Sequence, residues 1–441
     1  YGLQERFEEA LNEYQNILLL DPRNGRVHYE MGRLHFEQEA YDKAEQALRT
    51  ATSIDANMIN AYLMLGEIYI AKDQLFEAEN MYRKAIEVEP ESVESHGGLA
   101  NVYNLQKNYG KAVDELRQIV ERTPEEPDVH AELGRILEEQ HSYEEAIHAY
   151  GKAIEIAQDR VDIRFEKARL HRELRQEEAC EKELVDILEK DYRHIEALKM
   201  LGQLKFDQSY FKEASTYYFR ANEVAPTDAS ILRSLGECYY QLEMNAKARD
   251  AFERAIELDT EDRESRLRMG ELARNDGDFE TAAEHYEMAA QGADDDYDLQ
   301  LKLGECFNEL DRLNEAEEAY KRALSVRPND SAIHLQLGLI LKKQGKLDEA
   351  IASLQKTKEA DPANATVYLE IGRAYINKGL LGQAITELKR AVNYEPTNPN
   401  YRFELGRCYV SQGLLEEGRN EFDRVVRMDP TFHGAHFELG K

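Results

Sequence analysis

The sequence contains no tryptophan, only four cysteines and only ten prolines among its 441 residues. Four cysteines are too few for a disulfide framework in a chain of this length. Cys238, Cys306 and Cys408 are separated by multiples of 34 residues, so they occupy one position in different structural units. Helices packed about 8–10 Å apart would keep their Cα atoms beyond the roughly 7 Å limit for a disulfide. We therefore expect all four cysteines to be small buried apolar residues, which favours a reducing, cytoplasmic compartment.

Long apolar segments are also missing, because the sequence has no run of about 18 apolar residues. We therefore predict no direct membrane insertion of this chain. The first residues, YGLQERFEEALNEY, contain neither the basic nor the apolar region of a signal peptide, and they lack an initiator methionine. We expect Tyr1 and Lys441 to lie inside helices of incomplete repeats, and the chain to be a segment of a longer protein.

Basic residues are outnumbered, with 56 lysines and arginines against 87 aspartates and glutamates and a formal net charge of −31. Nucleic acids and anionic membrane surfaces bind chiefly through basic residues, so they would repel this chain. We predict no nucleic-acid partner. Two explanations of the acidity remain open. It keeps a long surface soluble, or it attracts basic partners.

The sequence does contain a period of 34 residues that runs from end to end. Small residues fill thirteen positions at this spacing, eleven of them with glycine: Gly32, Gly66, Ala100, Gly134, Ala168, Gly202, Gly236, Gly270, Gly304, Gly338, Gly372, Gly406 and Gly440. A second column holds alanine in most units, from Ala10 through Ala316 to Ala384. Eight of the ten prolines form a third column: Pro22, Pro90, Pro124, Pro226, Pro328, Pro362, Pro396 and Pro430. Three columns in one register establish an internal repeat.

Each column has a physical interpretation within a pair of helices. Apolar residues precede the glycine, and an aromatic residue such as Tyr69 or Tyr239 often follows it, which is typical of an amphipathic helix. Glycine in a helix costs roughly 1 kcal/mol relative to alanine, so its return indicates close helix packing. Aromatic residues four positions after the alanine column fill a second helix, which the proline then ends. Each unit therefore has to stack on its neighbours to bury its apolar faces.

These columns resemble the tetratricopeptide repeat (TPR), and the resemblance covers essentially the whole chain. We assign residues 1–24 to a partial repeat, 25–432 to twelve contiguous 34-residue repeats and 433–441 to the start of another. The expected fold class is all-α. The resemblance implies a right-handed superhelical solenoid of stacked antiparallel helix pairs, with a concave groove lined mainly by the first helix of each. The repeat at 161–194 departs most from the family pattern, with Ala168 in place of glycine and Cys180 in place of alanine.

Signatures of catalysis are absent, since no GxxxxGK[ST], GxGxxG, GxSxG or HExxH motif occurs. The run GADDDYDLQ at 292–300 offers four carboxylates to a calcium ion. It also precedes a helix, where carboxylates cap exposed N–H groups, and we favour that role. His141 and His148 lie seven residues apart, as a transition-metal pair or an ordinary surface pair. We predict no enzymatic activity, no bound metal and no cofactor.

Two further sets of polar residues are expected to be structural. Histidine fills the column where the family often carries tryptophan, and we expect these residues to pack with a polar edge: His28, His96, His130, His334 and His436. In the stretch DRLNEAEEAYKRALSVRPND at 311–330, we expect Glu315, Glu317 and Glu318 to be solvated helix surface.

The charge of the predicted groove changes in blocks along the first helices. A basic cluster comes first, then an acidic ladder, then a second basic block: Arg135, Arg169 and Arg172; Glu237, Glu271 and Glu305; Lys342, Lys343, Arg373 and Arg407. One interpretation is an extended or helical segment of a partner protein that matches these blocks in charge. The other is that arginines and glutamates of adjacent repeats pair with one another, at little gain each. Aromatic residues such as Phe165, Tyr240 and Phe403 either anchor a partner or pack between helices.

Two ligand-binding arrangements of the family are disfavoured by the groove positions. Some members clamp an acidic chaperone C-terminus with paired lysines and asparagines, but here Asn101 stands alone, opposite Gly97. Others line the groove with asparagines beside a glycosyltransferase domain. This chain has glutamates at those positions: Glu30, Glu132, Glu166, Glu370, Glu404 and Glu438.

The sequence therefore predicts a non-enzymatic scaffold that holds other proteins along its groove as part of a multiprotein complex. The alternative is a partner- or substrate-recruiting segment of a larger enzyme whose catalytic domain lies outside this chain.

Overall fold

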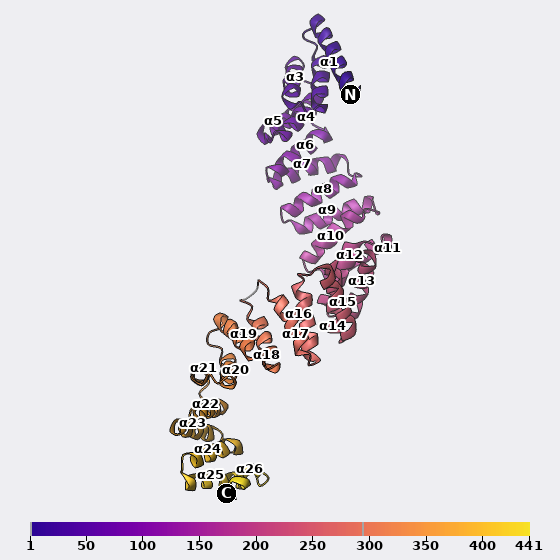
Figure 1. The fold of residues 1–441 in the computed structure, drawn as a ribbon. Coiled ribbons are helices and arrows are strands. Elements are labelled where there is room, and N and C mark those ends of the chain that lie inside the picture. Colours follow the sequence, from indigo (N-terminus) through magenta and orange to yellow (C-terminus); the bar gives the residue numbers. More distant parts are fainter. Residues whose placement is uncertain (1, 293–294) are drawn as a thin grey trace. The chain divides into compact units, whose positions relative to one another are not determined.

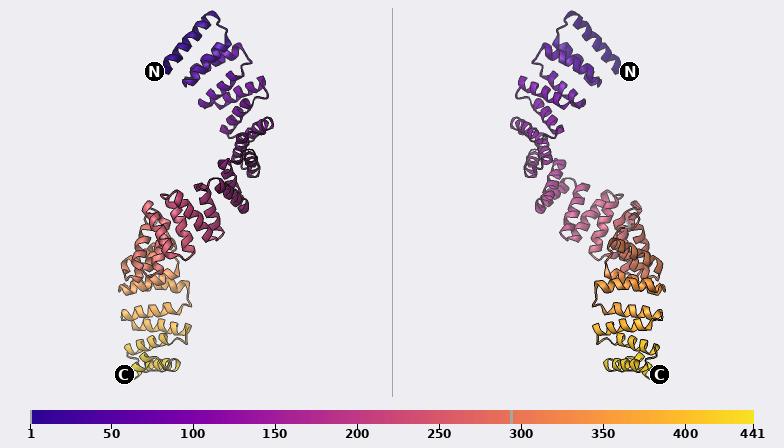
Figure 2. Two further views of the ribbon diagram at one scale, coloured as in Figure 1. Left: turned by 90° about the vertical axis from the view of Figure 1, so that its right-hand side faces the viewer. Right: turned by 90° about the vertical axis from the view of Figure 1, so that its left-hand side faces the viewer.

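The computed structural model describes residues 2–292 and 295–441, and all regular elements in these ranges are α-helices. Tyr1 and Asp294 lie outside the described residues. The chain divides into two compact units, Tyr1–Val224 and Ala225–Lys441. In each unit the helices follow one another in antiparallel pairs (Figures 1 and 2). The all-α prediction is confirmed.

In the first unit, six first helices have 13 residues each: α2 (Gly25–Glu37), α4 (Ile59–Ala71), α6 (Val93–Leu105), α8 (Pro127–Glu139), α10 (Val161–Glu173) and α12 (Ile195–Asp207). The second helices that follow them are α3 (Tyr41–Ile54), α5 (Leu75–Val88), α7 (Tyr109–Arg122), α9 (Tyr143–Ile156), α11 (Glu177–Lys190) and α13 (Phe211–Val224). Helix α1 (Gly2–Leu20) precedes them and packs on α2.

In the second unit, the first helices are α14 (Ala229–Gln241), α16 (Arg263–Asn275), α18 (Tyr297–Glu309), α20 (Ser331–Lys343), α22 (Ala365–Asn377), α24 (Pro399–Ser411) and α26 (His433–Leu439). The second helices are α15 (Asn245–Leu258), α17 (Phe279–Ala289), α19 (Leu313–Val326), α21 (Leu347–Ala360), α23 (Leu381–Tyr394) and α25 (Leu415–Met428).

Helix packing joins the pairs within each unit into an α-solenoid. Within a unit, a second helix packs on the first helix of its own pair and on that of the next pair, as α3 does on α2 and α4. First helices of successive pairs also contact one another, as in α4·α6 and α20·α22. The buried residues form a row of interfaces between helices, because no helix can cover its apolar stripe alone.

The glycine column marks the points of closest contact within a pair. A Cβ atom on Gly134 would lie 2.6 Å from the Tyr150 ring, and one on Gly270 would lie 2.5 Å from the Tyr286 ring. Where the column holds an alanine, the residue sixteen positions later is a leucine instead of an aromatic residue. Ala168 packs with Leu184 in this way.

The histidine column closes the turns between pairs. The His130 ring nitrogen Nε2 lies 2.9 Å from the Pro124 carbonyl oxygen, six residues earlier, and His334 makes the same contact with Pro328 at 2.9 Å. Tyr368 donates its hydroxyl to Pro362 at 2.7 Å, and Arg402 donates Nε–H to Pro396 at 3.1 Å. These residues pack with a polar edge, as expected. Their shared role is a hydrogen bond to the turn carbonyl.

The turn inside each pair requires a left-handed residue. Gly345 has φ +79° and Asp311, one period earlier, has φ 56°. The glycine avoids the steric cost that the aspartate bears there.

The cysteines are buried, as expected, and burial raises the pKa of the Cys180 thiol to about 11 and that of Cys238 to about 12. The expectation for Glu317 is wrong, because this residue is 7% exposed and holds Lys321 and Lys346 on its two oxygens. Among the described residues, no helix is long and apolar enough to cross a membrane.

Candidate partner-binding surface

The predicted groove residues all lie on the first helices, α8 and α10 in one unit and α14 to α24 in the other. We call the surface that the first helices form in each unit the first-helix face. Its residues repeat in position but differ in charge and size from pair to pair.

The predicted basic cluster in the first unit is largely neutralised. Arg135 donates Nε–H to Glu132 on its own helix at 2.8 Å. Arg169 pairs with Glu166, one turn earlier, at 2.9 Å and also with Glu138 on α8. Arg172 is exposed and makes no ion pair with the residues that the structure describes. Of these three arginines, Arg172 alone is without an ion-pair partner among the described residues.

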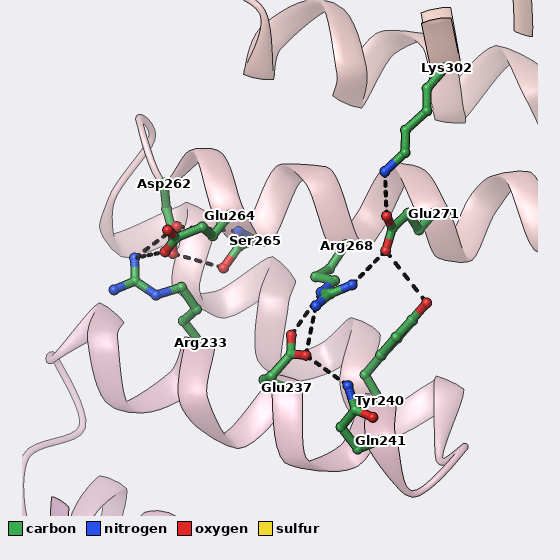
Figure 3. A network of polar contacts seen from close by, with 10 residues as sticks. All are labelled: Arg233, Glu237, Tyr240, Gln241, Asp262, Glu264, Ser265, Arg268, Glu271 and Lys302. Carbon is green, nitrogen blue, oxygen red and sulfur yellow. Dashed lines mark hydrogen bonds and ion pairs between the residues drawn. The ribbon is translucent and has the colours of Figure 1, made fainter. Parts of the chain in front are cut away.

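The predicted acidic ladder in the second unit is a chain of ion pairs between neighbouring first helices (Figure 3). Arg268 on α16 binds Glu237 on α14 at 2.8 Å and Glu271 on its own helix at 2.8 Å. Lys302 on α18 binds the other oxygen of Glu271 at 2.6 Å. Burial would raise the pKa of Glu271, but the hydrogen bonds from Lys302 and Arg268 outweigh it and lower that pKa. The Arg268 guanidinium also covers the Tyr240 ring at 4.8 Å.

The same two helices are joined a second time, near the start of α16 (Figure 3). Asp262 caps α16 by accepting a hydrogen bond from Ser265 N at 3.3 Å, and Arg233 on α14 binds its buried carboxylate at 3.1 Å. Further along the unit, Glu305 pairs with Arg274 at 2.9 Å. The ladder is thus neutralised at each of its three glutamates.

The second basic block is paired in part. Lys342 and Arg373 both bind Glu370, and Arg373 also reaches Glu404 at 2.8 Å. Arg407 lies 3.7 Å from Glu404, and Lys343 Nζ lies 3.3 Å from the Asn308 side-chain oxygen. Lys343 and Arg407 remain exposed.

These contacts match the second interpretation of the sequence, in which adjacent repeats pair their charges. The sequence prediction followed mainly the residue after each glycine of the column, so it missed Arg268, Arg274 and Lys302. A second spacing, between the two residues of an ion pair, would have found them. Several of the pairs join residues 31 positions apart, which is one repeat less one helical turn: Glu138–Arg169, Glu237–Arg268, Glu271–Lys302, Arg274–Glu305 and Arg373–Glu404.

The aromatic residues of the face pack between helices. The Phe165 ring lies 5.5 Å from the His194 ring, and the Phe403 ring lies 5.0 Å from Phe432 and 5.7 Å from Phe422. Tyr240 is covered by Arg268, as described above.

A hollow opens on the first-helix face of the first unit, over α4, α6 and α8. It consists of two adjoining parts of about 540 and 320 Å³ that share Gly97 and Asn101. Its apolar lining includes Leu63, Ile70 and Val93, and its acidic groups include Glu67.

Within residues 2–292 and 295–441, no group of three or more histidine, cysteine, aspartate or glutamate residues is placed to hold a metal ion. Asp296 caps α18 by accepting from Leu299 N at 3.0 Å, which confirms the capping role for this member of the acidic run. His141 contacts the Tyr143 hydroxyl at 3.0 Å, and His148 is exposed on α9.

The paired helices, the glycine and alanine columns and the stacked interfaces define a TPR α-solenoid, a class of protein that binds other proteins. A family model for the tetratricopeptide repeat matches residues 106–163. Two models for one particular family cover most of the chain. The model described as "Cilia and flagella-associated protein 70 C-terminal domain" matches residues 166–436, more than half of the chain, and the model described as "Cilia and flagella-associated protein 70 middle TPR-like domain" matches residues 2–118. The chain belongs to the cilia and flagella-associated protein 70 family.

Solved structures with a similar arrangement of helices include YrrB, "a TPR protein with an unusual peptide-binding site", at 23% identity, with 41% of this chain and 92% of that chain covered and a TM-score of 0.38. MamA of Desulfovibrio magneticus is 21% identical over 38% of this chain and 96% of that chain, with a TM-score of 0.37. The Naa15/Naa10 complex bound to HypK-THB is 14% identical over 100% of this chain and 76% of that chain, with a TM-score of 0.42. The comparison with curated proteins found no match.

Proposed function

We propose that the chain is a non-enzymatic scaffold that binds other proteins along its first-helix face and organises them within a larger assembly of cilia or flagella. The proposal includes the repeat boundaries given above, with twelve units over 25–432. The family match supports the setting in cilia or flagella.

The observation that carries this proposal is a contrast between the positions that pack inside a helix pair and the positions on the first-helix face. The glycine of the Gly134 column returns in nearly every pair, and the Tyr150 column always holds a large apolar or aromatic residue, since the stack requires them. Face positions change from Glu305 to Leu339 to Arg373 over two periods, so the stack does not fix one residue type there. These positions can therefore differ in the partner groups that they bind.

The structure sharpens the choice of residues for a test. Reversing Arg135 or Arg169 would place a glutamate beside Glu132, Glu138 and Glu166, and the repulsion would itself destabilise the helices. Arg172, Lys343 and Arg407 are exposed, and none is held in a close ion pair within the described part of the chain. Changes at these three positions disturb the ion pairs of the face least, so they report mainly on binding.

The experiment compares the triple variant R172E/K343E/R407E with a control triple on second helices, K182E/K356E/R427E, which makes the same change in net charge at exposed sites. Each variant is cross-linked to its partners in ciliary extract, and the bound partners are recovered with it. Circular dichroism compares the helicity of the two variants. We expect the face triple to lose partners that the control triple keeps, by at least about tenfold, because one charged contact that a partner covers contributes about 1.5 kcal/mol or more. Equal recovery by the two triples would overturn the proposal.

A further inference from the structure

The hollow over α4, α6 and α8 differs from the rest of the first-helix face in one respect. Two positions of each repeat are compared on this face: the residue directly after the glycine column, as Glu237 follows Gly236, and the residue two positions before it, as Glu132 precedes Gly134. The other acidic residues at these positions are held in ion pairs: Glu30, Glu132, Glu166, Glu237, Glu271, Glu305, Glu370, Glu404 and Glu438. Glu67, at one of these positions, makes no ion pair or hydrogen bond with any residue that the structure describes.

The repeats themselves show what is missing. Glu237 is bound by the residue 31 positions later, Arg268, and Glu271 is bound by the residue 31 positions later, Lys302. Residue 31 positions after Glu67 is Gly98. The base that neutralises the acid elsewhere on the face is therefore absent from this part of the chain.

Packing explains why the chain has no base there. A Cβ atom on Gly98 would lie 2.0 Å from the Tyr82 ring, so no larger residue fits while that ring holds its place. Tyr82 is 4% exposed and also packs against Gly66, where a Cβ atom would meet the ring at 2.6 Å. The stack thus needs Gly98, and Glu67 is left unpaired as a consequence.

The space that an arginine or lysine side chain would fill stays open. Gly97 adds no side chain, and the nearest atom to a Cβ built there is Ile119 Cδ1 at 3.9 Å. The result is the hollow of about 540 Å³ with Leu63 and Ile70 on its apolar side and Glu67 at its rim. Although Glu67 is accessible, the surrounding protein desolvates its carboxylate and raises its pKa.

We infer that this hollow binds a protein segment that supplies the missing cation, with a lysine or arginine on Glu67 and a neighbouring apolar side chain over Gly97. This inference rests on the proposed function, because it names the chemistry of a partner at the first-helix face. The apolar side of the hollow strengthens such an ion pair relative to open solvent, and the cation supplies a partner for a carboxylate that has none among the described residues.

The test uses an array of synthetic peptides with the pattern Leu-Ala-X-Ala-Leu between alanine flanks, in which X is arginine, lysine, norleucine or glutamate. The chain should bind the arginine and lysine peptides about tenfold better than the norleucine peptide, since a charge-assisted hydrogen bond is worth that ratio. In E67Q this ratio should fall to near one. In G97L, where the added side chain fills the hollow and leucine favours the helix over glycine, binding of all four peptides should be lost.

The matched control is E237Q, which neutralises a glutamate that Arg268 already holds, and it should keep the preference for cationic peptides. This control matters because a chain of net charge −31 attracts any cationic peptide weakly. A wild-type chain without the preference, or E67Q with the preference intact, would overturn the inference.

Its failure is distinguishable from that of the proposed function. If the array shows no preference and R172E/K343E/R407E still loses its partners, the inference on Glu67 is wrong and the proposed function stands. If that triple variant keeps its partners, the proposed function falls whatever the array shows.

Discussion

A hydrogen bond from one side chain to the carbonyl six residues earlier closes several of the turns between helix pairs. Histidine, tyrosine and arginine all fill this column, and each brings a donor to the carbonyl within 2.7 to 3.1 Å, as Tyr368, His130 and Arg402 do. Where the bond forms, a donor is what these residues share and not a ring, although the column also holds Leu198 and Leu232, which have no donor. The turn carbonyl would otherwise lose its partner in the protein.

Replacing His130 by phenylalanine removes this donor and keeps an aromatic ring. We expect amides of the turn at 123–130 to exchange about fivefold faster, because one hydrogen bond is worth about 1 kcal/mol. The measurement is hydrogen–deuterium exchange. H130Y is the matched variant and should restore protection, since Tyr368 makes the equivalent bond at 2.7 Å. Equal exchange in H130F and H130Y would contradict the role of the donor.

Glu317 links α19 to α21 and gives the chain a pH-dependent contact. Burial would raise the pKa of this carboxyl, but hydrogen bonds from Lys321 and Lys346 outweigh it and lower the pKa to about 2. A carboxyl whose folded pKa lies below its unfolded value of about 4.3 stabilises the fold at higher pH. That contribution is present above about pH 5 and is lost as the pH falls toward 2.

We therefore expect E317Q to lower the melting temperature at pH 7 and to approach the wild type as the pH falls to 3. Melting followed by circular dichroism at pH 7, 5, 4 and 3 measures the difference. E318Q, at an exposed neighbour, should differ little from the wild type throughout. If the difference in melting temperature between E317Q and the wild type stays constant with pH, the ion pair of Glu317 contributes nothing to stability.

Gly134 and Gly151 lie in the same helix pair, and replacing each by alanine should change the stability of the chain in opposite directions. A Cβ atom on Gly134 would strike the Tyr150 ring at 2.6 Å, whereas the nearest atom to one on Gly151 is the mobile end of Lys167 at 3.9 Å. We expect G134A to destabilise the chain by about 1–3 kcal/mol through overpacking, and G151A to stabilise it by up to about 1 kcal/mol through helix propensity. Urea unfolding measures both. If both alanines stabilise, close packing is not the reason for the glycine column.

Helix pairs were the part of the structure that the sequence predicted best. The columns at Gly134, Ala146, Tyr150 and Pro124 report steric requirements that each pair meets alone, so one sequence shows them by repetition. Ion pairs such as Glu237–Arg268 join two different pairs, and they depend on which rotamers the long side chains adopt. A single column of residues could not show them. For the same reason, Glu317 was taken for solvated surface, since Lys346 comes from the next pair.

At the scale of the whole chain, the charge pattern has a different meaning from the one that the sequence suggested. The blocks of Arg135, Glu237 and Lys342 looked like charged patches, but neighbouring residues of opposite sign hold most of them. The net charge of −31 therefore resides mainly in other acidic residues. On the face itself, the informative residues are those left without a partner, above all Arg172 and Glu67.

The central claim is that partners bind the first-helix face, and hydrogen–deuterium exchange of the chain with and without a recovered partner tests it most directly. We predict that the partner slows amide exchange in first helices, such as α4, α6 and α8, and leaves amide exchange in the second helices α5, α7 and α9 unchanged. Protection confined to the second helices would contradict the account.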